Sequence, residues 1–465
     1  MKKKILSLLG AFGLLIFTSC NNEAPQQEES DKTQMKSKPK VENLPLEWTK
    51  DANIYEVNVR QYTEEGTFNA FAKQLPRLKN MGVDILWFMP IHPIGKENGK
   101  GSLGSYYSIS DYKAVNPEFG NIDDFKNLVN LAHENGMYVL IDWVANHTAW
   151  DHHWMKTNPE YYELNEQGEM FAPYDWSDVV SLEYNNKEMR AEMIDALEYW
   201  VREADIDGYR CDVASEVPID FWVDARKQIE KIKPVFMLAE SEESDLLEYA
   251  FDMNYGWEFH HIMNGVAKGE KGRNEILEYF NKEKENTPER AYKMYFITNH
   301  DENSWNGTID ERLGDAADAM AVLSFTLHGM PLIYSGQEAE NAKRLEFFEK
   351  DVIDWKGYSK VKFYSMLIAM KHKYQALWNG AYGGELNIIE TDNDKVLCYS
   401  RKGEDAEVFV MINLSSEDVE VIPTKNSITD LQSRLKSNVK VNKAGKTFEM
   451  GPWGYTIMVR ENTAE

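Results

Sequence analysis

The sequence predicts an α/β fold whose main domain is a (β/α)8 TIM barrel, because short apolar runs alternate with longer amphipathic segments from Trp48 onward. The short runs are apolar almost throughout, which is typical of parallel strands that helices cover on both faces. Eight such units in roughly 330 residues favour a closed barrel over an open doubly wound sheet. No Gly-rich dinucleotide-binding motif follows the first strand, which also disfavours the open sheet.

The order of the predicted elements follows this alternation. Strands are expected over residues 54–59, 84–89, 138–144, 207–212, 235–240, 251–254, 295–299 and 332–335. Helices are expected over residues 68–81, 122–135, 188–204, 221–231, 316–328 and 360–377. Gly82 and Gly136 follow the first two helices, and glycine readily takes the left-handed conformation that ends a helix.

Changes in this pattern predict the domain boundaries. The barrel is expected over residues 45–380, with an inserted small domain at 147–182 after the third strand. That insert is rich in His, Trp, Tyr and Asp, and long insertions after barrel strands usually shape the active face. Over residues 381–465 the apolar period changes to two, which predicts a C-terminal all-β sandwich domain.

The N-terminus has the pattern of an export signal. Three lysines precede the apolar stretch Ile5–Phe17, which is short for a membrane span, and the stretch leads to Cys20. The end of this segment resembles a bacterial lipobox, so residues 1–20 are expected to be a lipoprotein signal peptide with lipidation at Cys20. An ordinary signal peptide cut nearby and an uncleaved anchor are the alternatives.

Residues 21–44 are polar and charged, which predicts a disordered tether behind the lipid anchor. Together these features predict an exported, membrane-anchored lipoprotein that faces the periplasm or the cell surface. The net charge of −26 excludes nucleic acid as a partner, because no basic surface would neutralise phosphates. It does not oppose an uncharged substrate.

Acidic residues stand at the ends of several predicted strands. Asp212 ends the fourth strand, Glu240 ends the fifth, and Asp301 follows the seventh. Since the carboxyl ends of barrel strands meet at one face, these three side chains are expected to converge. One acid at a strand end is more often solvated or ion-paired, but three that each close an apolar run predict a reactive site.

Paired carboxyl groups suit glycosyl transfer, which needs a protonated acid and an ionised nucleophile in one step. Arg210 lies on the same strand face as Asp212 and is expected to keep that carboxylate charged. Glu240 follows an apolar run, and burial is expected to raise its pKa. The two carboxyl groups are therefore expected to differ in the direction that the reaction needs.

Four segments in this order resemble the signatures of the α-amylase family of retaining glycoside hydrolases. They are residues 142–147, 208–212, 238–240 and 299–301, and residues 175–182 and 104–107 resemble two further family segments. The resemblance extends from Trp48 to the C-terminal domain and implies a barrel enzyme that acts on α-glucans. With the export signal, the chain resembles a bacterial lipoprotein member of that family.

The resemblance also implies residue roles. Asp212 would be the nucleophile, Glu240 the general acid and then base, and Asp301 the group that steadies the transition state. His147 and His300 would bind hydroxyl groups of the reacting sugar, Tyr107 would stack beneath it, and Arg210 is expected among the substrate-binding residues. Asn146 matches a family calcium ligand, and carboxylates of the insert such as Asp175 and Asp178 could supply further oxygen donors. A structural calcium ion is therefore expected, and no organic cofactor.

The chain departs from the family pattern beyond the nucleophile. Ser215 and Glu216 stand where the family often has Lys-His, which removes typical contacts to the sugar beyond the cleavage point. The expected activity is hydrolysis of α-1,4-glucosidic bonds in starch-derived glucans or malto-oligosaccharides. A transglycosylase or isomerase on the same scaffold is the first alternative. A non-catalytic glycan-binding protein is the second, although such a protein would be expected to lack one of the three acids.

Overall fold

The computed structural model describes residues 40–424, 428, 431–442 and 447–462. The predicted signal peptide, the lipidation site Cys20 and tether residues 21–39 lie outside the described residues. Within the described residues, no helix has both the length and the apolar character needed to cross a membrane.

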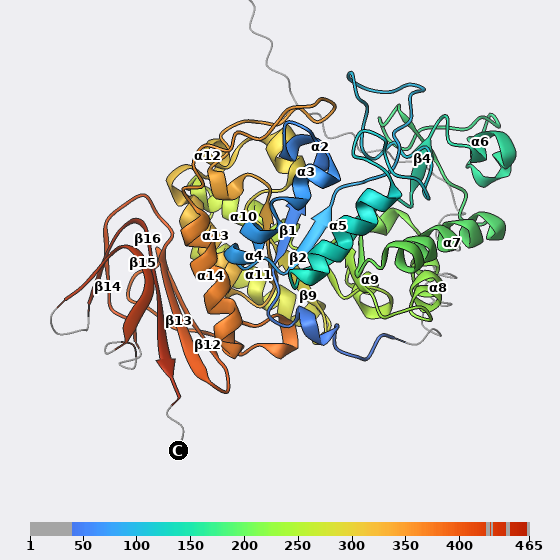
Figure 1. Ribbon diagram of the computed structural model, residues 1–465. Helices are drawn as coiled ribbons and strands as arrows, with labels where there is room; N and C mark the ends of the chain where they lie inside the picture. The colour runs from blue at the N-terminus through green and yellow to red at the C-terminus, as the bar shows by residue number, and fades with distance from the viewer. Residues whose placement is uncertain (1–39, 425–427, 429–430, 443–446, 463–465) are drawn as a thin grey trace, which may run out of the picture. The chain divides into compact units, whose positions relative to one another are not determined.

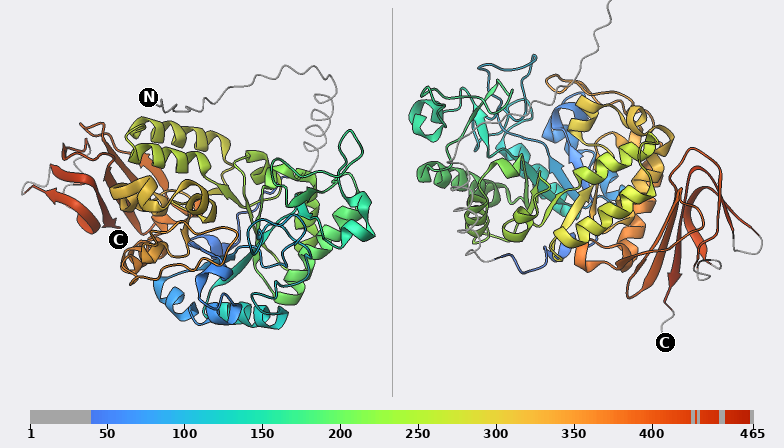
Figure 2. Two further views of the ribbon diagram at one scale, coloured as in Figure 1. Left: turned by 90° about the horizontal axis from the view of Figure 1, so that it is seen from above. Right: turned by 180° about the vertical axis from the view of Figure 1, so that it is seen from behind.

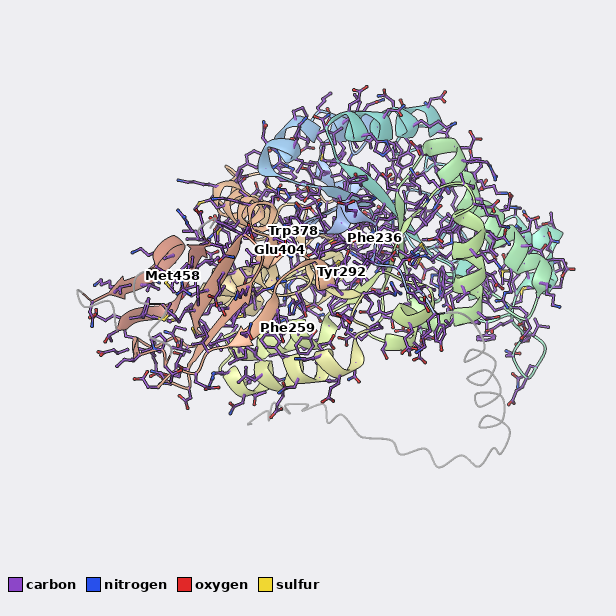
Figure 3. All side chains as sticks on the ribbon, turned by 90° about the horizontal axis from the view of Figure 1, so that it is seen from below. Phe236, Phe259, Tyr292, Trp378, Glu404 and Met458 are labelled. Carbon is purple, nitrogen blue, oxygen red and sulfur yellow. The ribbon has the colours of Figure 1, made fainter. Side chains whose placement is uncertain are left out.

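Eight parallel strands close into the predicted barrel (Figure 1). Their order around the barrel is β1-β10-β9-β8-β7-β6-β3-β2. The strands are β1 Ile54–Val57, β2 Ile85–Phe88, β3 Tyr138–Trp143, β6 Gly208–Cys211, β7 Phe236–Ala239, β8 Met253–Tyr255, β9 Tyr292–Tyr295 and β10 Met330–Tyr334. Alternate strand residues fill the interior of the barrel with apolar side chains, among them Trp87, Leu140 and Leu238. The rings of Phe236 and Tyr292 stack in this interior, with their centroids 6.4 Å apart (Figure 3).

Helices surround this barrel, as Figure 2 shows from two further directions. They are α2 Val59–Tyr62, α3 Phe68–Ala72, α4 Leu75–Met81, α5 Ile122–Glu134, α7 Lys187–Ala204, α8 Ile219–Ile229, α9 Ser244–Tyr249, α10 Trp257–Ala267, α11 Arg273–Asn286, α12 Ile309–Leu313, α13 Ala317–Thr326 and α14 Val361–Lys373. Asn121 caps α5 in a capping box, and Gly82 ends α4 with a φ of 98°.

Two predicted elements differ from the structure. The expected helix over residues 68–81 is broken into α3 and α4, because Pro76 stands in the first turn of α4 and cannot continue a preceding helix. The seventh strand runs from Tyr292 to Tyr295, earlier than expected. The start of this strand was not predicted because Lys293 interrupts its apolar sequence. In the structure Lys293 is buried in the strand, and its Nζ pairs with a Glu283 carboxylate oxygen at 3.5 Å.

The insert after β3 contains a small antiparallel sheet, β4 His147–Ala149 and β5 Val179–Ser181, with α6 Trp154–Thr157 between them. The C-terminal domain is antiparallel β. Its strands are β11 Glu385–Ile388, β12 Val396–Lys402, β13 Ala406–Asn413, β14 Val419–Val421, β15 Gln432–Val441 and β16 Phe448–Glu461. The predicted fold class is thus confirmed: a closed barrel, a small inserted sheet and a C-terminal β domain.

A buried arginine joins the β domain to the barrel. Arg401 on β12 is fully buried and donates to the carbonyl oxygens of Leu327, Trp378 and Gly384 (Figure 3 labels Trp378). Because these acceptors lie outside the β domain's own strands, one side chain ties the two parts together.

Candidate active site

The three acids predicted from the strand ends lie in one cleft. Asp212 follows β6 directly, Glu240 follows β7 directly, and Asp301 lies in the loop after β9. The cleft has a volume of about 470 Å³, and its lining also includes Tyr107, His147 and His300. The site therefore stands at the carboxyl ends of the barrel strands, where barrel enzymes carry their reactive groups.

Arg210 lies beneath the carboxyl groups and connects them. Its Nη1 donates to Asp142 Oδ1 at 2.8 Å and to Asp212 Oδ1 at 2.9 Å, and its Nη2 lies 2.7 Å from Glu240 Oε1. The guanidinium is fully buried, so it acts on the carboxyl groups, where the sequence-based prediction had it among the substrate-binding residues. Asp212 and Glu240 thus share one planar cation, and both line the cleft.

This shared contact acts on both carboxyl groups. The sequence suggested that Arg210 would favour the ionised form of Asp212, and the cation favours the ionised form of Glu240 as well. Burial is the larger effect and raises the pKa of Asp212 and Glu240 above their ordinary values. The Arg210 guanidinium opposes this rise in pKa at both carboxyl groups.

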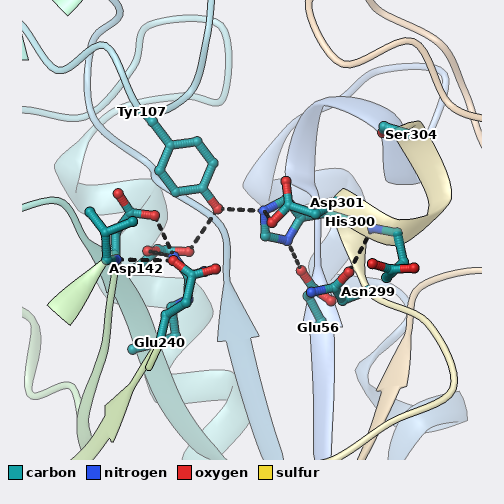
Figure 4. A network of polar contacts seen from close by, with 12 residues as sticks. Glu56, Tyr107, Asp142, Glu240, Asn299, His300, Asp301 and Ser304 are labelled. Atoms are coloured by element: carbon teal, nitrogen blue, oxygen red, sulfur yellow. Dashed lines mark hydrogen bonds and ion pairs between the residues drawn. The ribbon is translucent and has the colours of Figure 1, made fainter. Parts of the chain in front are cut away.

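His300 supplies a second buried cation to the cluster. Burial opposes its charge, but Asp301 and Glu56 outweigh burial and raise the pKa of His300 to about 9. The protonated ring donates from Nδ1 to Glu56 and from Nε2 to the Tyr107 hydroxyl at 2.8 Å, and Figure 4 shows this row of contacts. The Tyr107 hydroxyl in turn donates to Asp142 at 3.1 Å.

Glu56 and Asp142 belong to this cluster, although the sequence did not single them out as site residues. Both are fully buried, and burial raises the pKa of each, that of Asp142 to about 7. Each stands inside an apolar strand, and a buried charge in a strand is the signal that could have found them. Five carboxyl groups around two cations keep at least one proton at neutral pH, since burial opposes full ionisation.

The loop after β6 supports the carboxyl group of Glu240. The Val213 N–H donates to Glu240 Oε2 at 3.0 Å. Val213 has a φ of 36° and a ψ of 50°, a left-handed conformation that β-branched residues rarely adopt. Such strain is found where the surrounding structure holds a functional geometry, and here it aims a backbone donor at Glu240.

Aromatic side chains line the cleft. The Trp176 ring lies 5.5 Å from His147, and 5.0 Å from the ring of Tyr174, which is 67% exposed beside the cleft. Trp305, which is 53% exposed, lies 5.3 Å from Phe347. Flat rings of this kind can stack on the apolar faces of sugars.

Burial keeps His147 neutral at the floor of the cleft. It lowers the pKa of His147 to about 4, although Asp178 opposes this shift. A neutral imidazole can both donate and accept, which suits contact with an uncharged hydroxyl group.

The comparisons with known proteins agree with this geometry. A family model described as "Alpha amylase, catalytic domain" matches residues 27–169 and 159–363. The chain belongs to the alpha-amylase family of glycoside hydrolases.

The names of relatives within the family describe more than one reaction. The chain is 27% identical to an alpha-amylase of Haloarcula japonica over 83% of its own length, and 26% identical to an alpha-1,4-glucan:maltose-1-phosphate maltosyltransferase of Picrophilus torridus over 80%. It spans 59% and 64% of the lengths of these two relatives. The crystal structure of an alpha-amylase from Lactobacillus plantarum superposes with a TM-score of 0.77 at 29% identity, covering 89% of this chain and 99% of that one.

The residues expected to bind calcium each have other surroundings in the structure. Asp178 pairs with Lys100 at 3.0 Å, Asp175 is exposed in the cleft, and the Asn146 amide contacts His147 Nδ1 at 3.3 Å. Throughout the described ranges, no group of three or more His, Cys, Asp or Glu side chains could hold a metal ion. The calcium site stays a prediction, and no step proposed below passes through a metal.

Proposed function

We propose that the protein hydrolyses α-1,4-glucosidic bonds of starch-derived glucans or malto-oligosaccharides by a retaining double displacement. The observation that carries this proposal is that the two terminal nitrogens of the Arg210 guanidinium contact Asp212 and Glu240 in the cleft. An ionised carboxylate and a protonated carboxyl group aimed at one point are what glycosyl transfer with retention requires.

In the first step the Asp212 carboxylate attacks the anomeric carbon while Glu240 transfers its proton to the leaving glycosidic oxygen. The bond from the anomeric carbon to that oxygen breaks, and a glycosyl ester with Asp212 forms. In the second step the Glu240 carboxylate takes a proton from water, whose oxygen displaces Asp212 from the anomeric carbon. The product keeps the α configuration, and both carboxyl groups return to their starting states.

The neighbouring residues support these two steps. Asp301 lies at the cleft, 3.3 Å from His300 Nε2, and its carboxylate would stabilise positive charge that develops on the sugar. Tyr107 would stack beneath the reacting sugar, while His147 and His300 would bind its hydroxyl groups. Arg210 would favour the ionised form of Asp212 before the attack and would stabilise the Glu240 carboxylate once Glu240 has given up its proton.

Transfer to a second sugar is the competing outcome of the same chemistry, and the pair formed by Trp176 in the cleft and Tyr174 beside it favours this transfer. Because Val213 contacts Glu240, the loop 213–216 flanks the proton donor and therefore the leaving-group side. Tyr174 forms a hydrogen bond with Glu216 on that loop, which offers an aromatic surface to an acceptor sugar.

The proposal is tested by chromatography of products formed from amylose, pullulan and maltotriose over time, with and without added glucose. Hydrolysis of amylose and maltotriose is expected, with the Asp212→Asn variant losing activity by more than about a thousandfold while remaining folded. Asp175→Asn, an exposed acid of the same cleft, serves as the matched control. Binding of amylose without release of reducing ends would instead support a non-catalytic glycan-binding protein.

We also propose that the enzyme is exported and held at a membrane through a lipid on Cys20. The lysines before the apolar stretch and the polar segment after Cys20 support this proposal. Replacing Cys20 with alanine should move the protein from the membrane fraction to the soluble fraction. An unchanged membrane fraction would contradict lipidation at Cys20.

A further inference from the structure

A second cavity of about 730 Å³ lies between the barrel and the C-terminal β domain. On the barrel side its lining comes from α12, the start of α13, the loop after β10 and the start of α14. These segments follow β9 and β10, so the cavity lies at the same end of the barrel as the catalytic carboxyl groups. The two cavities share no lining residue.

An irregularity of the β domain brings an aromatic ring to this cavity. Ser437 pairs with Tyr455 and Val439 with Met450, so Asn438 alone stands opposite the four residues Gly451–Gly454. Trp453 lies in this bulge with a φ of 52°, a conformation that bulky residues rarely adopt. Since β-bulges re-aim side chains and often adjoin functional sites, the irregularity is a reason to look for a ligand at Trp453.

The bulge requires glycine at position 454, where two backbone carbonyl oxygens lie close to the chain. A Cβ on Gly454 would lie 2.8 Å from the carbonyl oxygen of Asn438 and 2.9 Å from that of Gly451. Asn438 itself has a φ of 52° and donates from its amide to the Pro452 carbonyl at 3.2 Å. Backbone contacts therefore hold the segment that carries Trp453 in one shape.

The charges of the cavity define the class of ligand. Lys360 binds both oxygens of Asp318, at 2.7 and 2.8 Å, so its charge is already offset. Asp310, Asp315 and Glu340 add further negative charge to the lining, which opposes an anionic ligand. Within the part of the chain that the structure covers, no cluster of acidic or histidine side chains could hold a metal ion.

An aromatic ring beside carboxylate and amide groups fits an uncharged sugar. The ring offers a surface to the apolar face of a pyranose, and the oxygen atoms accept hydrogen bonds from its hydroxyl groups. Asp310 lies only five residues after the exposed Trp305 of the catalytic cleft. One continuous segment thus contributes to both cavities.

We propose that this cavity is a second binding site for α-glucan, with Trp453 as its stacking surface, and that it increases the affinity for long chains. The proposal rests on the glucan activity proposed above. A long chain would occupy both sites, whereas maltotriose would occupy only the catalytic cleft.

The test compares wild type with Trp453→Ala on amylose and on maltotriose. KM for amylose is expected to rise by about 3- to 10-fold, with kcat and all parameters for maltotriose unchanged. Trp453→Phe keeps a ring and should restore most of the amylose affinity. Ile422→Ala, at an exposed apolar residue of the same domain outside the cavity lining, is the matched control.

Binding is measured separately in the Asp212→Asn background by calorimetric titration with maltoheptaose. Two sites per chain are expected, and one after Trp453→Ala. A single site in both proteins, or equal changes in KM for amylose and maltotriose, would overturn the second site. Loss of the proposed function is a different outcome, because a wild-type enzyme without activity on any α-glucan could still show binding that depends on Trp453.

Discussion

Arg210 is the residue on which the arrangement of the active site depends. A single buried guanidinium contacts Asp142, Asp212 and Glu240, and removing one partner of such a buried network typically costs about 3–5 kcal/mol. Its position on the same strand face as Asp212 could be derived from the sequence, because side chains alternate along a strand. Its contact with Glu240 could not, since that contact depends on how neighbouring strands align in the barrel.

The same reason explains which site residues could be predicted. Asp212, Glu240 and Asp301 end apolar runs, so the rule for barrel strands brings them to one face. Tyr107, His147 and His300 needed the family resemblance, because no local pattern marks them. Glu56 and Asp142 were missed as site residues because their strands are buried on all sides and their charges are compensated only in space.

The rate lost on removing the acidic proton of Glu240 should depend on how strongly the leaving group needs protonation. In Glu240→Gln, cleavage of maltoheptaose is expected to slow by about 10²- to 10⁴-fold, the usual contribution of a general acid. An aryl α-maltoside with a nitrophenol leaving group needs little protonation, so its first step should slow by less than about tenfold. Rapid-mixing measurement of the nitrophenol burst checks this, and equal losses on both substrates would contradict the assigned role.

At the scale of elements, the insert after β3 completes the cleft. Its segment with Tyr174, Asp175 and Trp176 reaches the loop after β6, through the hydrogen bond between Tyr174 and Glu216. The sequence indicated that the insert would shape the active face and that Glu216 would alter the leaving-group side. The pairing of these two residues follows only from the fold, because they belong to different loops.

Tyr174 should therefore affect the choice between water and a sugar acceptor. With maltotriose and added glucose, Tyr174→Ala is expected to lower the ratio of transfer to hydrolysis by about 2- to 10-fold, since an aromatic contact contributes about 0.5–1.5 kcal/mol. Tyr174→Phe keeps the ring but loses the hydrogen bond to Glu216. Its ratio of transfer to hydrolysis should lie between the ratios of wild type and Tyr174→Ala.

Leu164→Ala is the control for this experiment, because Leu164 is an exposed residue of the same insert whose side chain has no ring to offer a sugar. The same product ratio in Tyr174→Ala and wild type would remove Tyr174 from the acceptor side.

The predicted elements failed where a local interaction overrides the apolar pattern. Pro76 divides one expected helix into two. Lys293 interrupts the apolar sequence at the start of β9, and its charge is compensated there by an ion pair with Glu283. The prediction also named no helix between residues 232 and 315, where the structure has α9, α10, α11 and α12. The apolar runs of the remaining strands were sufficient to predict them, because each strand is buried by helices on its outer face.

For the whole molecule, the buried charges of the site predict how stability depends on pH. His300 has an ordinary pKa of 6.5 and a pKa of about 9 in the folded protein, so the folded state binds its proton more tightly than the unfolded chain. This contribution is fully present below pH 6.5 and is lost as the pH rises through 9, at up to about 1.4 kcal/mol per pH unit.

Urea denaturation of wild type between pH 6 and 9.5, compared with the double variant Glu56→Gln/His300→Gln, checks this prediction. Both residues are replaced because burial raises the pKa of Glu56 and the charge of His300 opposes this rise, so the loss of His300 alone would also change the titration of Glu56. Wild type should lose stability more steeply than the double variant as the pH rises. Parallel curves would show that His300 has no raised pKa in the folded protein.

The account of the whole molecule depends on Asp212 forming a covalent bond with the sugar while Glu240 supplies the proton. The most direct measurement is mass spectrometry of peptides after incubation with an activated, ring-fluorinated α-glucosyl fluoride, which slows release of the intermediate. We predict a single glycosylated peptide with the sugar on Asp212, and no label in Asp212→Asn. A label on another residue would contradict the account, as would continued turnover with no labelled peptide.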